Sequence, residues 1–320
     1  MAAEQTSPLS ANAGVSPLAT EESRQRALLR GRVASTPGFY QRAWRRFSKN
    51  HVSMVALGAA VLVILFVLSA GLISEYVTGV DYAKGNLRNK LQGPFVENHP
   101  LGTDLNGRDL LTRLAYGGRI SLMVATLATI SILVIGSIVG SVSGFYGGAV
   151  DTFLMRLVDV MLCLPEIAIL LLVSAIFTPG PVGLAFIIAA IGWTTVARLI
   201  RGEVLGLRNR DFVDAARVIG ASNTRLMTRH IFPNVIPIIV VYISLAIPGL
   251  ILTEATLSFL GFGVQIPTPS WGNMLQDATA FYTQSAWNVL LPGFAIYVAV
   301  LAINLVGNGL RDALDPRLKD

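Results

Sequence analysis

Long apolar runs separated by polar segments are the dominant pattern of this chain. Six runs have roughly the 20 residues that a helix needs to cross the hydrocarbon core of a bilayer. These runs cover approximately 52–73, 120–143, 152–177, 182–199, 236–261 and 288–308. The pattern therefore predicts an all-α polytopic membrane protein with six transmembrane helices.

The composition agrees with a membrane protein. Of 320 residues, 53% are hydrophobic and 14% are charged, and the mean hydropathy is +0.60, which is too apolar for an ordinary soluble domain. A net charge of +6 would suggest nucleic acid binding in a soluble protein. Arginines on a cytoplasmic face explain it better here, so we expect no nucleic acid partner. The single cysteine, Cys163, excludes an intrachain disulfide.

Positive charge is concentrated in three segments: the residues before the first run, the loop between the fourth and fifth runs, and the C-terminal end. Six crossings place all three segments on one face of the membrane. An excess of lysine and arginine marks the cytoplasmic face. We therefore expect both termini in the cytoplasm.

The N-terminal region precedes the first apolar run. Residues 1–36 have no long apolar stretch and are rich in Ala, Ser, Pro, Glu and Arg, so we expect a disordered cytoplasmic tail. In residues 37–50, Tyr40, Trp44 and Phe47 recur at helical spacing among basic residues. This pattern predicts an amphipathic helix in the membrane interface; a simple positively charged flank with aromatic residues fits equally well.

The loop at 200–235 is a polar segment between two apolar runs. Its first half predicts a short helix that carries Phe212, Ala215, Ala216 and Ile219 on one apolar face. Gly220 then ends that helix, because glycine tolerates a positive φ. The loop therefore has a defined structure outside the bilayer.

The second half of this loop predicts another short helix. Ser222 or Asn223 caps it, and Leu226, Met227 and Ile231 supply its apolar side chains. Pro233 and Pro237 mark the return to the membrane, where a missing backbone N–H does least harm. On composition alone, an ordinary helix–turn–helix connector is the simplest interpretation.

The spacing of this loop resembles a known motif. Asp214-Ala215-Ala216, then Gly220, then Pro233 resembles the EAA motif of the permease subunits of bacterial ABC importers, with Asp214 in place of the usual glutamate. The resemblance implies that this loop is a coupling helix that docks on an ATP-hydrolysing subunit. It assigns that contact to Asp214, Ala215, Ala216, Gly220, His230 and Pro233.

Three further stretches, at 99–122, 254–275 and 310–317, resemble the C-type permeases of dipeptide, oligopeptide and nickel importers. The resemblance runs from about residue 40 to the C-terminus. It implies the type I ABC importer permease fold, which is MetI-like. Its segments are a first span with a long outer loop at 51–118, a permease core at 119–309 and a cytoplasmic tail at 310–320.

The resemblance also implies the partners of this chain. They are a homologous B-type permease subunit, two ATP-binding subunits and an extracytoplasmic solute-binding protein, assembled with lipid in a bacterial inner membrane. The substrate is expected to be a dipeptide or oligopeptide, while a nickel chelate or a glutathione-like peptide stays open. ATP and Mg would be bound by the partners, so this chain is expected to hold no cofactor and to be no enzyme.

Charged residues inside spans are costly and need an account. Asp159 lies three residues after Arg156, which favours a local ion pair. Glu166 follows Pro165, which is expected to kink the span. Glu166 and Glu254 are candidates for the transport pathway, although structural pairing between helices is the simpler interpretation for all three acids.

Missing motifs narrow the function classes. The sequence has no Gly-x-x-x-x-Gly-Lys-Ser/Thr loop for ATP, its histidines are far apart, and no nucleophile-with-base motif favours a membrane enzyme. An alternative is a self-sufficient secondary transporter that couples to protons through Glu166 and Glu254. Such transporters commonly contain inverted repeats with paired broken helices, which this sequence does not clearly show.

Overall fold

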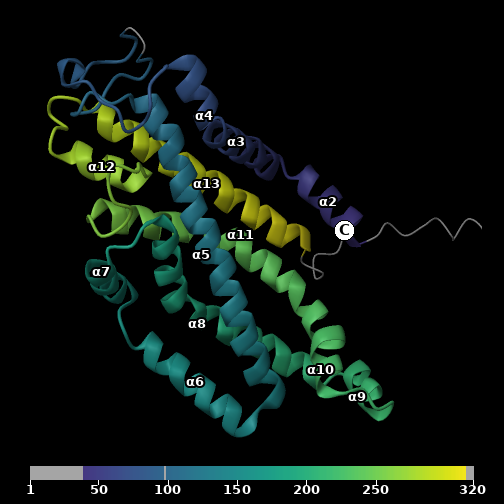
Figure 1. Cartoon of the computed structure of the whole chain (residues 1–320). Helices are drawn as coiled ribbons and strands as arrows, with labels where there is room; N and C mark the ends of the chain where they lie inside the picture. Colours follow the sequence, from purple (N-terminus) through teal and green to yellow (C-terminus); the bar gives the residue numbers. More distant parts are fainter. Residues whose placement is uncertain (1–38, 97–98, 315–320) are drawn as a thin grey trace, which may run out of the picture. The chain divides into compact units, whose positions relative to one another are not determined.

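The computed structural model describes residues 39–96 and 99–314, and these are mostly helical (Figure 1). The chain divides into two units, 1–45 and 46–320, and the arrangement below is that of the second unit. Within the described residues, the extended pairings are two isolated bridges, Val96 with His99 and Thr103 with Asp109. The predicted all-α class is confirmed.

Five long helices correspond to predicted spans. They are α3 (His51–Leu68), α5 (Leu110–Tyr146), α8 (Pro181–Arg208), α11 (Phe232–Phe259) and α13 (Trp287–Leu314). In the part of the chain that the structure describes, five helical runs are long and apolar enough to cross a bilayer, one of them running from Asn223 to Phe259. A sixth crossing results if α6 (Gly148–Leu162) and α7 (Glu166–Phe177) count as one span.

The shorter elements lie before, between and after these helices. They are α2 (Phe39–Lys49), α4 (Ala70–Leu72), the π-helix η1 (Ile73–Val77), the 3₁₀ helix η2 (Leu87–Asn89), α9 (Asp211–Val218), α10 (Asn223–Arg225), the π-helix η3 (Leu226–Ile231) and α12 (Trp271–Thr279). A helix is thus present within 37–50, while its place in a membrane interface stays a prediction. The predicted tail at 1–36 and the end of the tail at 310–320 lie outside the described residues.

Several helices extend beyond the predicted apolar runs. Helix α5 starts at Leu110 instead of near residue 120, because the Asp109 side chain accepts a hydrogen bond from the Thr112 backbone N–H at 2.7 Å and caps it. Helix α8 likewise continues to Arg208. Hydropathy marks the apolar centre of such a helix, whereas capping and tertiary packing decide where it begins and ends.

The third predicted span, 152–177, is wrong as a single helix. The structure has α6 and α7, bent by 83° at a break before Glu166. Proline lacks the N–H that would continue the helical hydrogen bonds, and Pro165 stands at the N-cap of α7. The predicted kink at this proline is therefore present, and it separates two helices.

The acid in this span has another partner than predicted. Asp159 accepts a hydrogen bond from Arg198 of α8 instead of pairing with Arg156 of its own helix. The predicted local pair is therefore wrong, whereas the interpretation of structural pairing between helices is confirmed for Asp159.

The centre of the described unit is the packing of α5 against α8. Gly136, Gly140 and Gly144 of α5 face α8, and a Cβ atom at these positions would meet Val196, Ile200 and Val204 respectively. Small residues every four positions let two helix backbones approach closely. The glycine repeat therefore serves packing within the chain.

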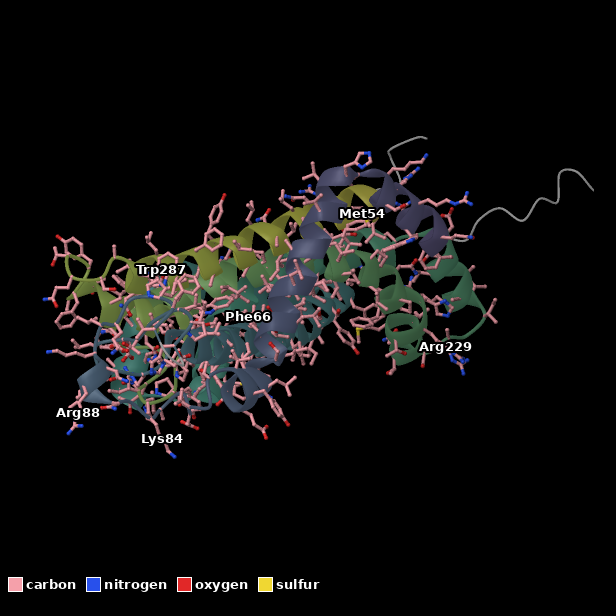
Figure 2. The ribbon with its side chains drawn as sticks, turned by 90° about the horizontal axis from the view of Figure 1, so that it is seen from above. Met54, Phe66, Lys84, Arg88, Arg229 and Trp287 are labelled. Atoms are coloured by element: carbon pink, nitrogen blue, oxygen red, sulfur yellow. The ribbon has the colours of Figure 1, made fainter. Side chains whose placement is uncertain are left out.

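The two ends of this unit carry different elements. Helix α12 and the 79–109 loop lie at one end, which we call the α12 end, and α9 and α10 lie at the other, the α9 end (Figure 1). Lys84, Arg88 and Trp287 project from the α12 end and Arg229 from the α9 end (Figure 2). The loop with the EAA-like motif is therefore separated from the long outer loop by the length of the spans.

Candidate functional site

The loop between α8 and α11 folds largely as the sequence predicts. Helix α9 ends at Val218, and Gly220 follows with φ at +87°. The Ala221 N–H donates to the Ala216 carbonyl at 3.0 Å, which closes the end of α9. The Ser222 hydroxyl then accepts from the Arg225 N–H at 3.4 Å and caps α10.

The second helix of this loop is not a separate element. Helix α10 continues through η3 directly into α11, so the chain returns to the membrane without a break. Pro233 lies in the first turn of α11 and Pro237 inside it. Local π-helical adjustments help to satisfy the backbone groups that a proline leaves without a partner in a membrane helix.

One side of the loop is anchored in the apolar core. Val213, Leu226 and Ile231 are fully buried and belong to the same apolar cluster as Val204 of α8 and Val235 of α11. Burying such side chains contributes about 1.5–3 kcal/mol each. The loop is therefore held firmly against the ends of two membrane helices.

The opposite side of α9 is an exposed apolar surface. Val218 and Ile219 are each 87% exposed and Phe212 is 43% exposed, with Ala215 exposed beside them. We expected Phe212, Ala215, Ala216 and Ile219 to share one apolar face. This prediction is wrong for Ala216, which packs inward against the core. Exposed apolar patches of this kind mark surfaces for a partner.

The charges of α9 surround that apolar surface. Asp214 lies in the first turn, where a negative charge interacts favourably with the helix dipole. Its Oδ1 is 2.8 Å from Arg217 Nη1, and both side chains are more than half exposed. A pair of this kind contributes at most about 1 kcal/mol, so Asp214 and Arg217 are available to a partner.

The remaining residues of the predicted contact lie on the neighbouring elements. His230 is in η3, which packs against α9, and its backbone carbonyl accepts from Asn234 Nδ2 at 2.6 Å. Pro233 is exposed at the start of α11. The structure thus places Asp214, Ala215 and Gly220 on the exposed surface of the α8–α11 loop, Ala216 on its inner side, and His230 and Pro233 on the adjoining helix.

The two glutamates of the spans lie in different environments. Glu166 is exposed at the start of α7, next to the break. Glu254 is fully buried, and its Oε1 accepts a hydrogen bond from Ser258 at 2.7 Å. The hydroxyls of Ser121 and Ser270 face the same carboxyl, while Oε2 has no partner within hydrogen-bond geometry among the described residues. The two carboxylates therefore do not form one site.

A second polar cluster, at the α12 end, was not predicted from the sequence. Asp104, Arg108 and Arg113 meet Asp277 of α12 there. The spacing of four between Asp104 and Arg108 is a recognisable signal, whereas Asp277 is 169 positions away from Arg108. The described residues contain no group of three or more His, Cys, Asp or Glu side chains that could hold a metal ion.

Comparison with known proteins decides the family. The model described as binding-protein-dependent transport system inner membrane component matches residues 115–320. The chain belongs to this family. A second model, described as the N-terminal TM domain of oligopeptide transport permease C, matches residues 38–94 of the permease.

Curated relatives agree with this membership. The permease is 39% identical to the dipeptide transport system permease protein DppC of Alkalihalophilus pseudofirmus over 280 residues, which cover 88% of this chain and 90% of the relative. It is 39% identical to the oligopeptide transport system permease protein OppC of Bacillus subtilis over 277 residues, 87% of this chain and 89% of the relative. The same identity holds for OppC of Escherichia coli over 280 residues, 87% of this chain and 91% of the relative.

These matches confirm several predictions. The permease resembles DppC and OppC along most of its length, and its core has the MetI-like fold. Because the relatives are named as transport permease proteins, the chain is a non-enzymatic membrane component of ABC importers. Its apolar helices agree with a multi-pass protein of the inner membrane.

Proposed function

We propose that this permease is the C-type subunit of an ATP-driven peptide importer and forms half of its translocation pathway. The relatives include permeases for dipeptides and for oligopeptides, so the proposal concerns peptides as a class. A homologous B-type permease subunit would supply the other half of the pathway. An extracytoplasmic solute-binding protein would deliver the peptide.

The observation that carries this proposal is the exposed apolar surface of α9. Phe212, Val218 and Ile219 face outward on a helix whose other side is anchored by the buried Val213. Such a surface on a short charged helix fits a groove on another protein. We assign that groove to an ATP-binding subunit, so that ATP and Mg are held by two partner subunits and this chain holds no cofactor.

The anchoring explains how a movement of the partner would reach the membrane. Val213 and Leu226 pack in one cluster with Val204 of α8 and Val235 of α11, so a displacement of α9 moves the ends of both helices. Closure of the ATP-binding subunits around ATP would thereby swing these spans from an inward-facing to an outward-facing arrangement. The asymmetry of basic residues supports an orientation with the α9 end and both termini in the cytoplasm.

A self-sufficient proton-coupled transporter is not supported. It would require Glu166 and Glu254 to act together, and one is exposed while the other is buried among serine hydroxyls. The family membership of the chain also favours an ATP-driven importer.

The experiment that tests this proposal is reconstitution. The permease is co-expressed with the genes of its proposed partner subunits, purified and placed in vesicles with the loaded solute-binding protein. Peptide uptake that requires ATP and continues with an uncoupler supports the proposal. Uptake by vesicles without ATP-binding subunits, abolished by an uncoupler, would contradict it.

A further inference from the structure

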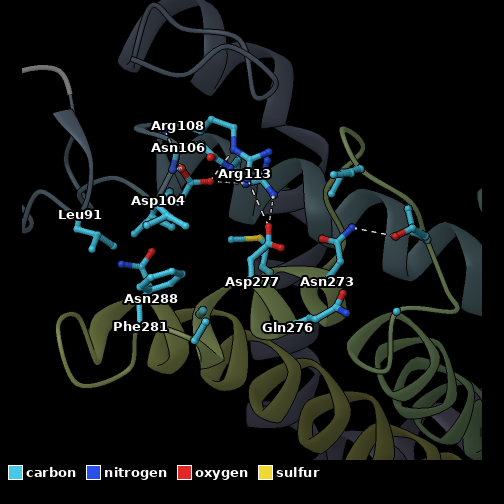
Figure 3. Close-up of a pocket in the computed structure, with 18 of the residues that line it drawn as sticks. Leu91, Asp104, Asn106, Arg108, Arg113, Asn273, Gln276, Asp277, Phe281 and Asn288 are labelled. Atoms are coloured by element: carbon cyan, nitrogen blue, oxygen red, sulfur yellow. Dashed lines mark hydrogen bonds and ion pairs between the residues drawn. The ribbon is translucent and has the colours of Figure 1, made fainter. Parts of the chain in front are cut away.

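A cavity of about 430 Å³ with charged side chains in its wall lies at the α12 end (Figure 3). Its walls come from the 79–109 loop, the first turn of α5, α12 with its flanking loops, and the first turn of α13. Its polar lining includes Asp104, Arg108, Arg113, Gln276, Asp277 and Asn288. This size is within the usual range for small-molecule sites.

The two aspartates of the cavity lie at different distances from its two arginines. Arg108 Nε lies 2.6 Å from Asp104 Oδ2, which makes a short charge-assisted hydrogen bond. Asp277 Oδ2 is farther from both arginines, at 3.4 Å from Arg108 Nη2 and 3.8 Å from Arg113 Nη2. Asp104 is therefore a fixed partner of the arginines, whereas Asp277 is a loose one.

One terminal nitrogen of Arg113, Nη2, lacks a hydrogen-bond acceptor among the described residues, whereas Nη1 donates to the Tyr82 carbonyl at 3.5 Å and Nε lies 3.5 Å from Asp104 Oδ2. The Arg113 side chain is 1% exposed. A buried guanidinium N–H without an acceptor is costly. Asp277, in contrast, is 40% exposed, so its carboxylate can turn towards solvent and leave room beside Arg113.

We propose that this cavity binds a short peptide by its two charged termini. The peptide carboxylate takes the place of Asp277 beside Arg113 and Arg108, and the peptide ammonium pairs with the displaced Asp277. The inference rests on the proposed function as a peptide importer and adds a binding site on this chain. The orientation proposed above places the site on the extracytoplasmic side, where peptide enters.

The charges of the cavity favour a ligand that carries one positive and one negative charge. Two arginines and two aspartates sum to zero, so a peptide with both termini free leaves the cavity neutral. A ligand with only a carboxylate would give the cavity a net negative charge and would lack the charge-assisted hydrogen bond to the displaced Asp277. A ligand with only an ammonium would leave Nη2 of Arg113 without an acceptor.

The test is isothermal titration calorimetry on the full-length chain, purified with its co-expressed transporter subunits in lipid nanodiscs without ATP or solute-binding protein. The probes are alanyl-alanine, its N-acetyl derivative and its C-terminal amide. We expect the free dipeptide to bind about tenfold more tightly than either blocked form, the usual effect of one charge-assisted hydrogen bond.

Two variants and a control locate the binding. Ala280 lines the cavity without a charge, so Ala280→Trp should fill it and abolish the heat. Asp277→Asn should lower the affinity for the free dipeptide by about tenfold. The same variant should bind the N-acetyl form at least as tightly as wild type does, because the carboxylate of Asp277 no longer competes for the arginines. Asp81 is an exposed acid of the same loop and lies outside the cavity lining; Asp81→Asn should change nothing.

Several results would overturn this site. These are equal affinity for the three probes, no heat in wild type, or an Ala280→Trp variant that binds like wild type. Normal peptide heats in both variants with weakened docking of the solute-binding protein would make the cavity a protein contact instead. Each of these results is compatible with ATP-dependent peptide uptake, so the failure of this site would not contradict the proposed function.

Discussion

Arg201 of α8 holds Asp151 of α6 in a bidentate ion pair, with Nε 2.5 Å from Oδ1 and Nη2 2.6 Å from Oδ2. The Ser143 hydroxyl of α5 donates to the same carboxylate. Three helices therefore meet at Asp151. Because Val158 is the one buried residue of α6, this pair fixes a helix that has little apolar anchoring of its own.

Arg201→Lys should destabilise the assembled permease. Lysine keeps the positive charge but cannot make two parallel hydrogen bonds to one carboxylate. We expect a loss of about 1–2 kcal/mol, moderated by the partial exposure of both groups. The measurement is the thermal unfolding midpoint of the purified complex in detergent.

A matched control is the pair of Asp159 and Arg198, which joins the same two helices but is about half exposed on each side. Asp159→Asn should cost less, about 0–1 kcal/mol. If Asp159→Asn lowers the midpoint as much as Arg201→Lys does, bidentate geometry is not what fixes α6.

Glu254→Gln should keep most of the assembled complex, whereas Glu254→Leu should reduce it. The glutamine oxygen can still accept the hydrogen bond from Ser258, but leucine would leave that buried hydroxyl without its acceptor. The measurement is the yield of complex in detergent, together with peptide uptake. Normal yield with abolished uptake in both variants would show that Glu254 acts in transport instead of assembly.

Local sequence signals predicted the parts of this fold that depend on local physics. Apolar runs located the spans, and glycine and serine chemistry located Gly220 and Ser222. The bend of 83° after α6 was not predictable in size, since Pro165 only removes a hydrogen bond and tertiary packing sets the angle. Arg198, the partner of Asp159, and Asp277, the second partner of Arg108, were missed because each lies on a helix distant in sequence.

The orientation of the chain can be tested by labelling single cysteines with an impermeant thiol reagent in intact cells. The background is Cys163→Ser, because Cys163 is exposed. Ser222→Cys, in the α8–α11 loop, should be protected, whereas Lys84→Cys and Thr283→Cys, both exposed residues of the α12 end, should react. Ser270 is unsuitable as a reporter because it is fully buried.

Labelling of Ser222→Cys from outside would contradict the proposed orientation. It would also contradict the assignment of α9 to an ATP-binding subunit, because that subunit is in the cytoplasm. Breaking the cells before labelling should make Ser222→Cys reactive and serves as the control for accessibility.

The contact proposed for α9 predicts that Ile219→Asp uncouples the transporter. Ile219 is 87% exposed, so its substitution should leave the fold and membrane insertion unchanged. An aspartate would introduce an unpaired charge into the apolar contact with the ATP-binding subunit. We expect reduced co-purification of that subunit, or loss of the ATPase stimulation that the loaded solute-binding protein produces. Asp214→Glu, which restores the usual residue of the motif, should be nearly silent.

Substitutions of Gly220 test whether coupling depends on the backbone conformation of the α8–α11 loop, in addition to its exposed side chains. Its φ is +87°, and a Cβ atom there would meet nothing within 4 Å, so only the backbone conformation opposes a side chain. Gly220→Val should therefore impose strain of about 1–3 kcal/mol and weaken coupling as Ile219→Asp does. Gly220→Asn adds a side chain that tolerates positive φ and should couple nearly normally. If Ile219→Asp and Gly220→Val both bind the ATP-binding subunits and couple like wild type, the α8–α11 loop is an ordinary connector and the proposed contact is wrong.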